Sequence, residues 1–163
     1  ALSALKICVF IVKKNGRNLS KFIKDLKSKN PLIKIRLMGH SLGTQVILSA
    51  VQSLAKNPKN KGIIESVHFF GASIPANSLA VRIHGNDFQK VVNDRITNYF
   101  SPYDDVLKAA HDEKWVESPI GYKGALGKTC SKYHQKILLQ KQQQQDAYSS
   151  DYPNFCPNQC SIQ

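Results

Sequence analysis

Short apolar runs of strand character alternate with helical patterns along this chain, and this alternation constrains its fold more than any other feature. Runs rich in β-branched and aromatic residues predict strands, and they read IKIRLMGHS, IIESVHFFGAS, RITNYFSP and KILLQ. Helical spacing of apolar residues predicts helices in LGTQVILSAVQSLAKN, within residues 75–93 and in DDVLKAAHDEKW. Strands that alternate with helices predict an α/β fold with a mostly parallel sheet flanked by helices.

The N-terminal region carries a further helical pattern. Within NGRNLSKFIKDLKSKNP, Leu19, Phe22, Ile23 and Leu26 share one helical face, and the closing Asn-Pro pair predicts its end. The preceding ALSALKICVFIVKK has an apolar stretch of about ten residues, which is too short to span a bilayer and lacks the basic leading segment of a signal peptide. We interpret it as a buried helix or strand, with ICVFIV as the candidate strand.

Length and composition indicate one globular domain followed by a tail. The chain has 163 residues, of which 42% are hydrophobic, and this is enough for a sizeable core. We expect an α/β domain over residues 1–140. Residues 141–163 are expected to form a separate tail, because KQQQQDAYSSDYPNFCPNQCSIQ is rich first in Gln and then in Pro and Cys.

The chain is strongly basic. Twenty-three Lys and Arg against eleven Asp and Glu give a formal net charge of +12, which raises nucleic acid and anionic membranes as partners. The cations are scattered, often singly between apolar residues, as at Lys21, Lys24, Lys27 and Lys34. Because no Arg-rich block or groove-binding motif accompanies them, we interpret them as solvated faces, and nucleic acid is not the expected partner.

Four cysteines are present, Cys8, Cys130, Cys156 and Cys160. Their spacing does not match a zinc ligand set, so no metal is expected. A disulfide between Cys156 and Cys160 stays open as an alternative. The lack of a secretory signal favours reduced thiols and a cytoplasmic location.

The strongest local signal for function is the run Gly39, His40, Ser41, Leu42, Gly43, which fits G-x-S-x-G between a predicted strand and a predicted helix. In this pattern the serine occupies a strained turn at the end of the sheet, and glycines avoid clashes with its neighbours. We therefore predict Ser41 as a nucleophile and the Leu42 N–H as an oxyanion donor. In the alternative interpretation, Ser41 only caps the helix.

A serine nucleophile needs a base, usually His, and a carboxylate that orients the base. In RITNYFSPYDDVL, Asp104 and Asp105 follow the third predicted strand, which is where such folds carry the acid. The alternative for either aspartate is to cap the helix that follows.

These segments resemble the α/β-hydrolase superfamily, in particular its uncharacterised esterase-like and lipase-like members, including archaeal ones. The resemblance lies in IRLMGHSLGTQVILSAVQSL, NYFSPYDDVLKAAHDE and SPIGYKGALG, and it covers roughly residues 15–139. It implies Ser41 as the nucleophile and Asp104 as the acid, with Asp105 as the alternative. Only about 32 residues precede Ile33, so the chain resembles the later part of that fold without its N-terminal strands.

The catalytic histidine is the hardest component to assign. The resemblance places it after the last strand, near QQQQDAYSSDY, and that stretch contains no His. His134 follows Asp104 in the sequence and is the best remaining candidate for the base, although it precedes KILLQ. The other histidines are interpreted as structural or as too close to the acid: His40, His68, His84 and His111.

Together these residues predict a serine hydrolase of carboxylic esters or acyl lipids that needs neither metal nor cofactor. Ser41 would attack the carbonyl, His134 would carry the proton and Asp104 would orient the imidazole. The expected partner is a small-molecule ester or lipid. The alternative is a hydrolase-like binding or scaffold domain without catalysis, because the late His and the early strands are missing. Those missing strands would also leave an open sheet edge for an oligomer.

Overall fold

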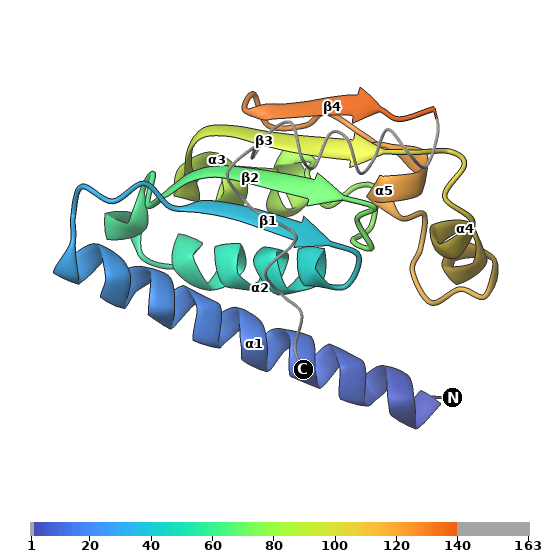
Figure 1. Ribbon diagram of the computed structural model, residues 1–163, viewed down its shortest axis with the longest axis horizontal. Helices are drawn as coiled ribbons and strands as arrows, with labels where there is room; N and C mark the ends of the chain where they lie inside the picture. The colour runs from blue at the N-terminus through green and yellow to red at the C-terminus, as the bar shows by residue number, and fades with distance from the viewer. Residues whose placement is uncertain (1, 140–163) are drawn as a thin grey trace, which may run out of the picture.

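The computed structural model describes the backbone of residues 2–139 and the side chains of residues 9–139. Helices and strands alternate along the chain (Figure 1). In chain order the elements are α1 (Leu2–Lys29), β1 (Arg36–His40), α2 (Gly43–Ala55), η1 (Pro58–Asn60), β2 (Ile64–Phe70), η2 (Val81–Gly85), α3 (Asn86–Val91), β3 (Val92–Phe100), α4 (Asp105–Asp112), α5 (Ile120–Lys123) and β4 (Tyr133–Ile137). The expected tail and its cysteines lie outside the described residues.

The four strands form one parallel sheet in the order β1-β2-β3-β4. One row across the sheet joins Met38 to His68, His68 to Thr97, and Thr97 to His134. Because all strands run in the same direction, their carboxyl ends meet at one edge. The predicted α/β fold with a parallel sheet flanked by helices is confirmed.

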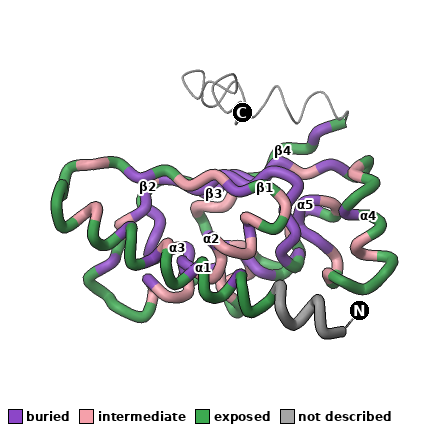
Figure 2. Tube along the Cα trace, turned by 60° about the horizontal axis from the view of Figure 1, so that its bottom comes forward, coloured by how far each residue is buried: buried purple, intermediate pink, exposed green. Residues whose placement is uncertain are grey.

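Helices α1, α2 and α3 lie on the same side of this sheet (Figures 1 and 2). The core lies between them and the strands. Helix α2 buries Ile47, Val51 and Leu54, and the strand side chains Val67 and Phe69 belong to the same buried cluster. The helical spacing predicted for the segment after Gly43 therefore corresponds to the face that packs on the sheet.

Helix α1 is longer than the sequence pattern predicted. It runs without interruption from Leu2 to Lys29, so of the two alternatives for ICVFIV the helix is correct and the strand is wrong. The helical period of buried residues continues upstream through Ile23, Gly16 and Val12, because this face packs against α2. The two helices approach closely at Gly16, where a Cβ would clash with the Ser49 side chain.

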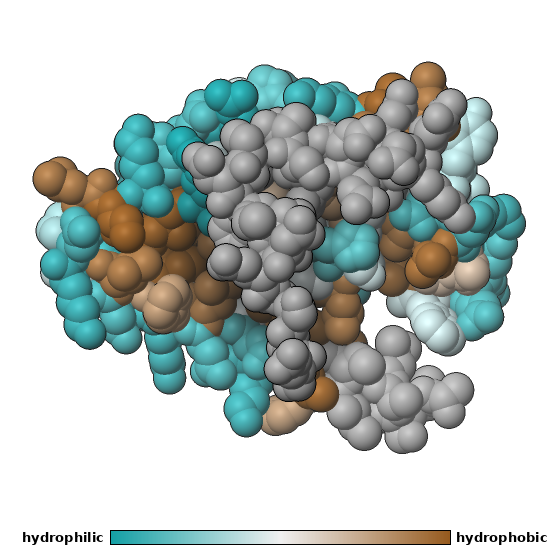
Figure 3. All heavy atoms as spheres, in the orientation of Figure 1, coloured by the Kyte–Doolittle hydropathy of each residue, from teal (hydrophilic) through white to brown (hydrophobic). Residues whose placement is uncertain are grey.

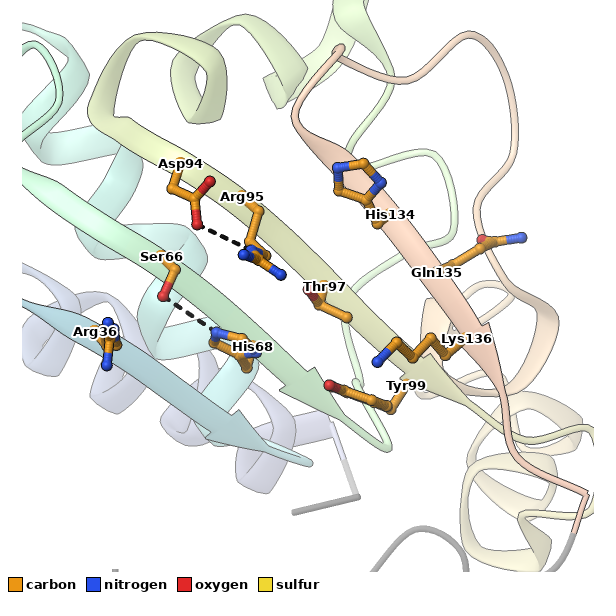
Figure 4. A pocket seen from close by; sticks show the side chains of 10 residues that line it. All are labelled: Arg36, Ser66, His68, Asp94, Arg95, Thr97, Tyr99, His134, Gln135 and Lys136. Carbon is orange, nitrogen blue, oxygen red and sulfur yellow. Dashed lines mark hydrogen bonds and ion pairs between the residues drawn. The ribbon is translucent and has the colours of Figure 1, made fainter. Parts of the chain in front are cut away.

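The opposite side of the sheet combines polar side chains with a small apolar cluster of Met38, Phe70, Tyr99 and Leu138 near the carboxyl ends of the strands. Side chains alternate between the two faces of each strand, and this face presents Arg36 from β1, His68 from β2, Thr97 from β3 and Lys136 from β4 (Figure 4). Within residues 2–139, no helix has the length and apolar character that a membrane span requires.

Candidate active site

Ser41 lies at the sharp turn that joins β1 to α2. Its φ angle is 49°, in the left-handed region that non-glycine residues rarely adopt. Because β1 ends at His40 and α2 begins at Gly43, the turn consists of Ser41 and Leu42 alone. A strand, a strained serine and a helix in succession form the local geometry that a G-x-S-x-G motif requires.

Hydrogen bonds hold this strained turn in place. The Ser41 N–H donates to the Phe70 carbonyl at the end of β2, at 3.2 Å. The Ser41 carbonyl accepts from the Thr44 N–H (3.1 Å), the Thr44 hydroxyl (2.6 Å) and the Ser73 hydroxyl (3.0 Å). The Gln45 amide donates to the carbonyl (3.1 Å) and the hydroxyl (3.2 Å) of Ser73. A strained residue persists when its surroundings over-determine its conformation, as they do here.

The two glycines of the motif differ in their surroundings. A Cβ on Gly39 would lie 2.8 Å from Ile47 Cδ1 and 3.2 Å from Thr44 Cα, so a larger residue would require Ile47 to move and would press on the backbone of α2. A Cβ on Gly43 would meet no described atom within 4 Å. The clash expected for both glycines is therefore correct for Gly39 and wrong for Gly43.

The Leu42 N–H is available to a ligand. Leu42 is the N-cap residue of α2, and its carbonyl accepts from the Gln45 N–H at 3.1 Å. Its own N–H donates no hydrogen bond to the protein within residues 2–139. An unused N–H at the positive end of a helix has the chemistry of an oxyanion donor.

A cavity of about 300 Å³ opens where β1, β2 and β3 end. Ser41 lines it from the end of β1, and Gly71 lines it from the end of β2. Asp104 and Asp105 line it from the segment after β3. The structure thus brings the candidate nucleophile and both candidate acids to one cavity.

Asp104 has a clear structural role at the start of α4. It is the N-cap residue, and its Oδ1 accepts from the Leu107 N–H at 2.9 Å. The helix cap that the sequence offered as an alternative role for this aspartate is therefore present, and it uses the Oδ1 atom. Asp104 is half-buried, whereas Asp105 is exposed in the first turn of the helix. A partly buried, oriented carboxylate suits the acid of a triad better than an exposed one.

His134 does not lie at this cavity. Strand β4 begins at Tyr133, three residues before the predicted run KILLQ, so His134 falls within the strand. It lines a separate polar pocket of about 780 Å³ on the sheet face away from the helices (Figure 4). Three strand spacings separate β4 from β1, which corresponds to about 14 Å. This placement does not fit the predicted role of His134 as the base for Ser41.

The remaining histidines occupy four different environments. His40, at the end of β1, lines the cavity of Ser41 and is exposed. His111 accepts a hydrogen bond at Nδ1 from the Ser118 N–H, at 3.3 Å. His68 hydrogen-bonds the Ser66 hydroxyl at 3.1 Å, and His84 contacts Gln52. Within residues 2–139, no histidine hydrogen-bonds the Ser41 hydroxyl.

Sequence reasoning did not identify Thr44, Gln45 and Ser73, which together fix the backbone of Ser41. Ser73 belongs to a segment that follows β2, and Thr44 and Gln45 lie in the first turn of α2. The available signal was positional, because polar residues that follow neighbouring parallel strands converge at one sheet edge. Which of these side chains hydrogen-bond to one another depends on the order of the strands in the sheet, and the sequence pattern does not predict that order.

The described residues contain no group of three or more His, Cys, Asp or Glu that could hold a metal ion. Cys130 is a buried free cysteine, and burial raises the pKa of its thiol. A thiol of raised pKa is a poor nucleophile at neutral pH, so Ser41 is the better candidate nucleophile.

Residues 12–139 match the model of a family described as alpha/beta hydrolase of unknown function (DUF900). No curated protein and no solved structure matches the chain. The matched range contains all four strands, the turn at Ser41 and the cap at Asp104.

Proposed function

Because this chain belongs to the family of α/β hydrolases of unknown function (DUF900), we propose that it is a serine hydrolase that cleaves carboxylic esters or acyl lipids. The observation that carries the proposal is the strained Ser41, with φ of 49°, in one cavity with Asp104. A serine on such a turn presents its hydroxyl at the end of the sheet, where a substrate carbonyl can reach it.

The chemistry proceeds in two steps. The Ser41 Oγ attacks the ester carbonyl and transfers its proton to a base, while the Leu42 N–H donates to the oxyanion that forms. The protonated base then delivers that proton to the alcohol, which leaves, and Ser41 keeps the acyl group. Water attacks this acyl-serine by the same route, releasing the carboxylic acid and restoring the serine hydroxyl. Asp104 orients the base and stabilises its protonated form.

The lining of the cavity supports an ester with an apolar part. Tyr103 and Val106 both line it, and their exposed fractions are 60% and 75%. Leu42, which adjoins Ser41, is 46% exposed. Apolar side chains left in solvent around a polar site favour a substrate that covers them.

For the base, the geometry favours His40 over His134. His40 lines the cavity with Ser41, and as the base it would take the serine proton directly or through one water. His134 lies on β4, three strands away from β1, and lines a different pocket. We accordingly expect His40→Ala to slow acylation more than His134→Ala does.

The test is intact mass after reaction with a fluorophosphonate, which labels activated serines. We expect one adduct on the native chain and none on Ser41→Ala, because the probe needs a serine whose proton a base removes. Circular dichroism of both proteins verifies that the variant is folded. An adduct that persists in Ser41→Ala would contradict the assignment of Ser41 as the nucleophile. A slower reaction for His134→Ala than for His40→Ala would favour His134 as the base.

A second candidate function is a hydrolase-like binding domain without catalysis. It is favoured by one observation, which is that no histidine within residues 2–139 hydrogen-bonds the Ser41 hydroxyl. In that case the folded native chain gives no adduct, and the cavity binds an ester without turning it over.

A further inference from the structure

Helix α1 presents a face that no described element covers. Its inner face packs on α2 through buried residues such as Val12 and Ile23. Residues on the other side of the helix are exposed, and α1 accordingly carries exposed stretches along its length in Figure 2. We call this the α1 outer face and define it by Phe10, Ile11, Lys14, Arg17, Lys21, Phe22 and Lys24.

Large apolar side chains stand on this face in solvent. Phe10 is 62% exposed and Phe22 is 63% exposed, and Ile11 between them is 46% exposed. Leu32, in the turn that follows α1, is 91% exposed. Single exposed apolar residues are common on protein surfaces, but two phenylalanines with their rings in water on one helix indicate a surface that a partner covers.

The α1 outer face carries four cations, Lys14, Arg17, Lys21 and Lys24, and at helical spacing the exposed Asp25 lies among them. From residue 9 to residue 32 the chain holds seven Lys and Arg but a single acid, Asp25. At helical spacing, Lys14, Arg17 and Lys21 lie in one row with Phe10. Figure 3 shows the α1 edge of the molecule as mostly hydrophilic, interrupted by hydrophobic side chains. About half of the formal net charge of +12 thus lies on one straight element.

We propose that the α1 outer face binds the surface of a membrane that contains anionic phospholipid. Charge complementarity draws the cations to the headgroups, and Phe10 and Phe22 enter the boundary between headgroups and acyl chains. The 28 residues of α1 span about 42 Å, which gives a straight element that lies along a flat surface. This binding does not depend on the proposed hydrolase activity.

The apolar residues favour a lipid surface over nucleic acid. Lysines and arginines bind phosphate in either partner, and phenylalanine can stack on unpaired bases. The aliphatic side chains Ile11 and Leu32 find no such partner on a nucleic acid. At a bilayer they gain burial of the same kind as the phenylalanines.

The experiment is cosedimentation of the full chain with vesicles of phosphatidylcholine alone or with added phosphatidylglycerol. We expect binding to the anionic vesicles that weakens with salt, since each cation near the surface strengthens it about fivefold. Lys14→Glu/Lys21→Glu removes two cations and should weaken binding by more than about 25-fold, and Phe10→Ser/Phe22→Ser should weaken it because two rings no longer enter the boundary. The matched control is Lys114→Glu/Lys128→Glu, which changes the net charge equally at two exposed lysines outside α1.

The outcomes separate the alternatives. Retained binding in the control, with loss in both α1 variants, supports the proposal, provided that thermal unfolding shows all variants folded. Equal loss in the control would mean that net charge alone drives binding and would overturn it. Failure of the native chain to bind anionic vesicles would also overturn the proposal. So would displacement of the vesicles by single-stranded RNA, if binding to that RNA depends on the lysines and not on the phenylalanines.

Discussion

At the scale of single residues, the candidate site requires an unfavourable backbone conformation at Ser41. A non-glycine residue in the left-handed region costs about 1–2 kcal/mol, and Ser41 adopts a φ of 49°. The bonds from Phe70, Thr44 and Ser73 hold it there. Glycine, which has no side chain, is therefore expected to stabilise the folded protein at this position relative to a residue with a side chain.

This conformational cost predicts that the usual order of stability of alanine and glycine variants is reversed at Ser41. We expect Ser41→Gly to match or exceed the unfolding free energy of Ser41→Ala, by up to about 1 kcal/mol, because glycine relieves the strain and loses part of the gain to its unfolded-state entropy. At exposed Asn18, in the interior of α1, the order should be normal, with the glycine variant less stable than the alanine variant by about 1 kcal/mol. Urea unfolding of the four variants measures both differences, and the same order at both positions would contradict a strained Ser41.

The sequence predicted the position of this turn but not its support. GHSLG between a strand pattern and a helix pattern located Ser41 and the close approach at Gly39. Thr44, Gln45 and Ser73 were missed because their hydrogen bonds join segments whose adjacency follows from strand order. The need for glycine at position 43 was wrong, because the space there is open.

At the scale of elements, helix α4 depends on the residue that is also the candidate acid. Asp104 caps its N-terminus by accepting from the Leu107 N–H. The helix is short, from Asp105 to Asp112, and buries one side chain, Leu107. A short, mostly exposed helix gains a large share of its stability from its cap.

Two substitutions separate the cap from the acid. Asp104→Asn keeps an oxygen that accepts from Leu107, so its unfolding free energy should stay within about 0.5 kcal/mol of the native value. Asp104→Ala loses the cap and should cost about 1 kcal/mol. If Asp104 is the acid, both variants react much more slowly with the fluorophosphonate. Native labelling rates in Asp104→Asn would leave this residue with the capping role alone.

Element types were predictable from periodicity, and element boundaries were less so. Strands β1 to β3 and helices α2 and α4 lie where the patterns indicated. The strand expected at ICVFIV is part of α1, because apolar runs of this length suit either state and the packing on α2 decides. Strand β4 begins at Tyr133, among polar residues that give little indication of a strand. His134 therefore lies within the strand, on a face of the sheet, and not before the strand as predicted.

At the scale of the whole molecule, the proton affinity of groups around β4 links stability to pH. Burial raises the pKa of the Cys130 thiol and of the Tyr133 hydroxyl. Both groups therefore hold their protons more tightly in the folded protein than in the unfolded chain. Above the unfolded pKa values, the unfolded chain releases these protons first and is stabilised relative to the fold.

We therefore expect these two groups to lower the unfolding free energy as the pH rises, above about 8.5 for the thiol and above about 10 for the phenol. Tyr133→Phe removes the second contribution, while Asn98 keeps its hydrogen bond to the Ile120 carbonyl. Its stability should decline less steeply above about pH 10. Denaturant unfolding across the alkaline range measures this, and identical slopes for the two proteins would contradict a raised Tyr133 pKa.

The spatial order of the strands is the same as their order in the chain, and every pairing is parallel. The sheet therefore grows in one direction as the chain is synthesised from its N-terminus. Once α1, β1 and α2 have left the ribosome, β1 already offers the edge on which β2 pairs, and β2 then does the same for β3. Within residues 2–139, no strand has to be inserted between two that are already paired, so partial chains that end after β2 or β3 contain shorter versions of the sheet that these residues form.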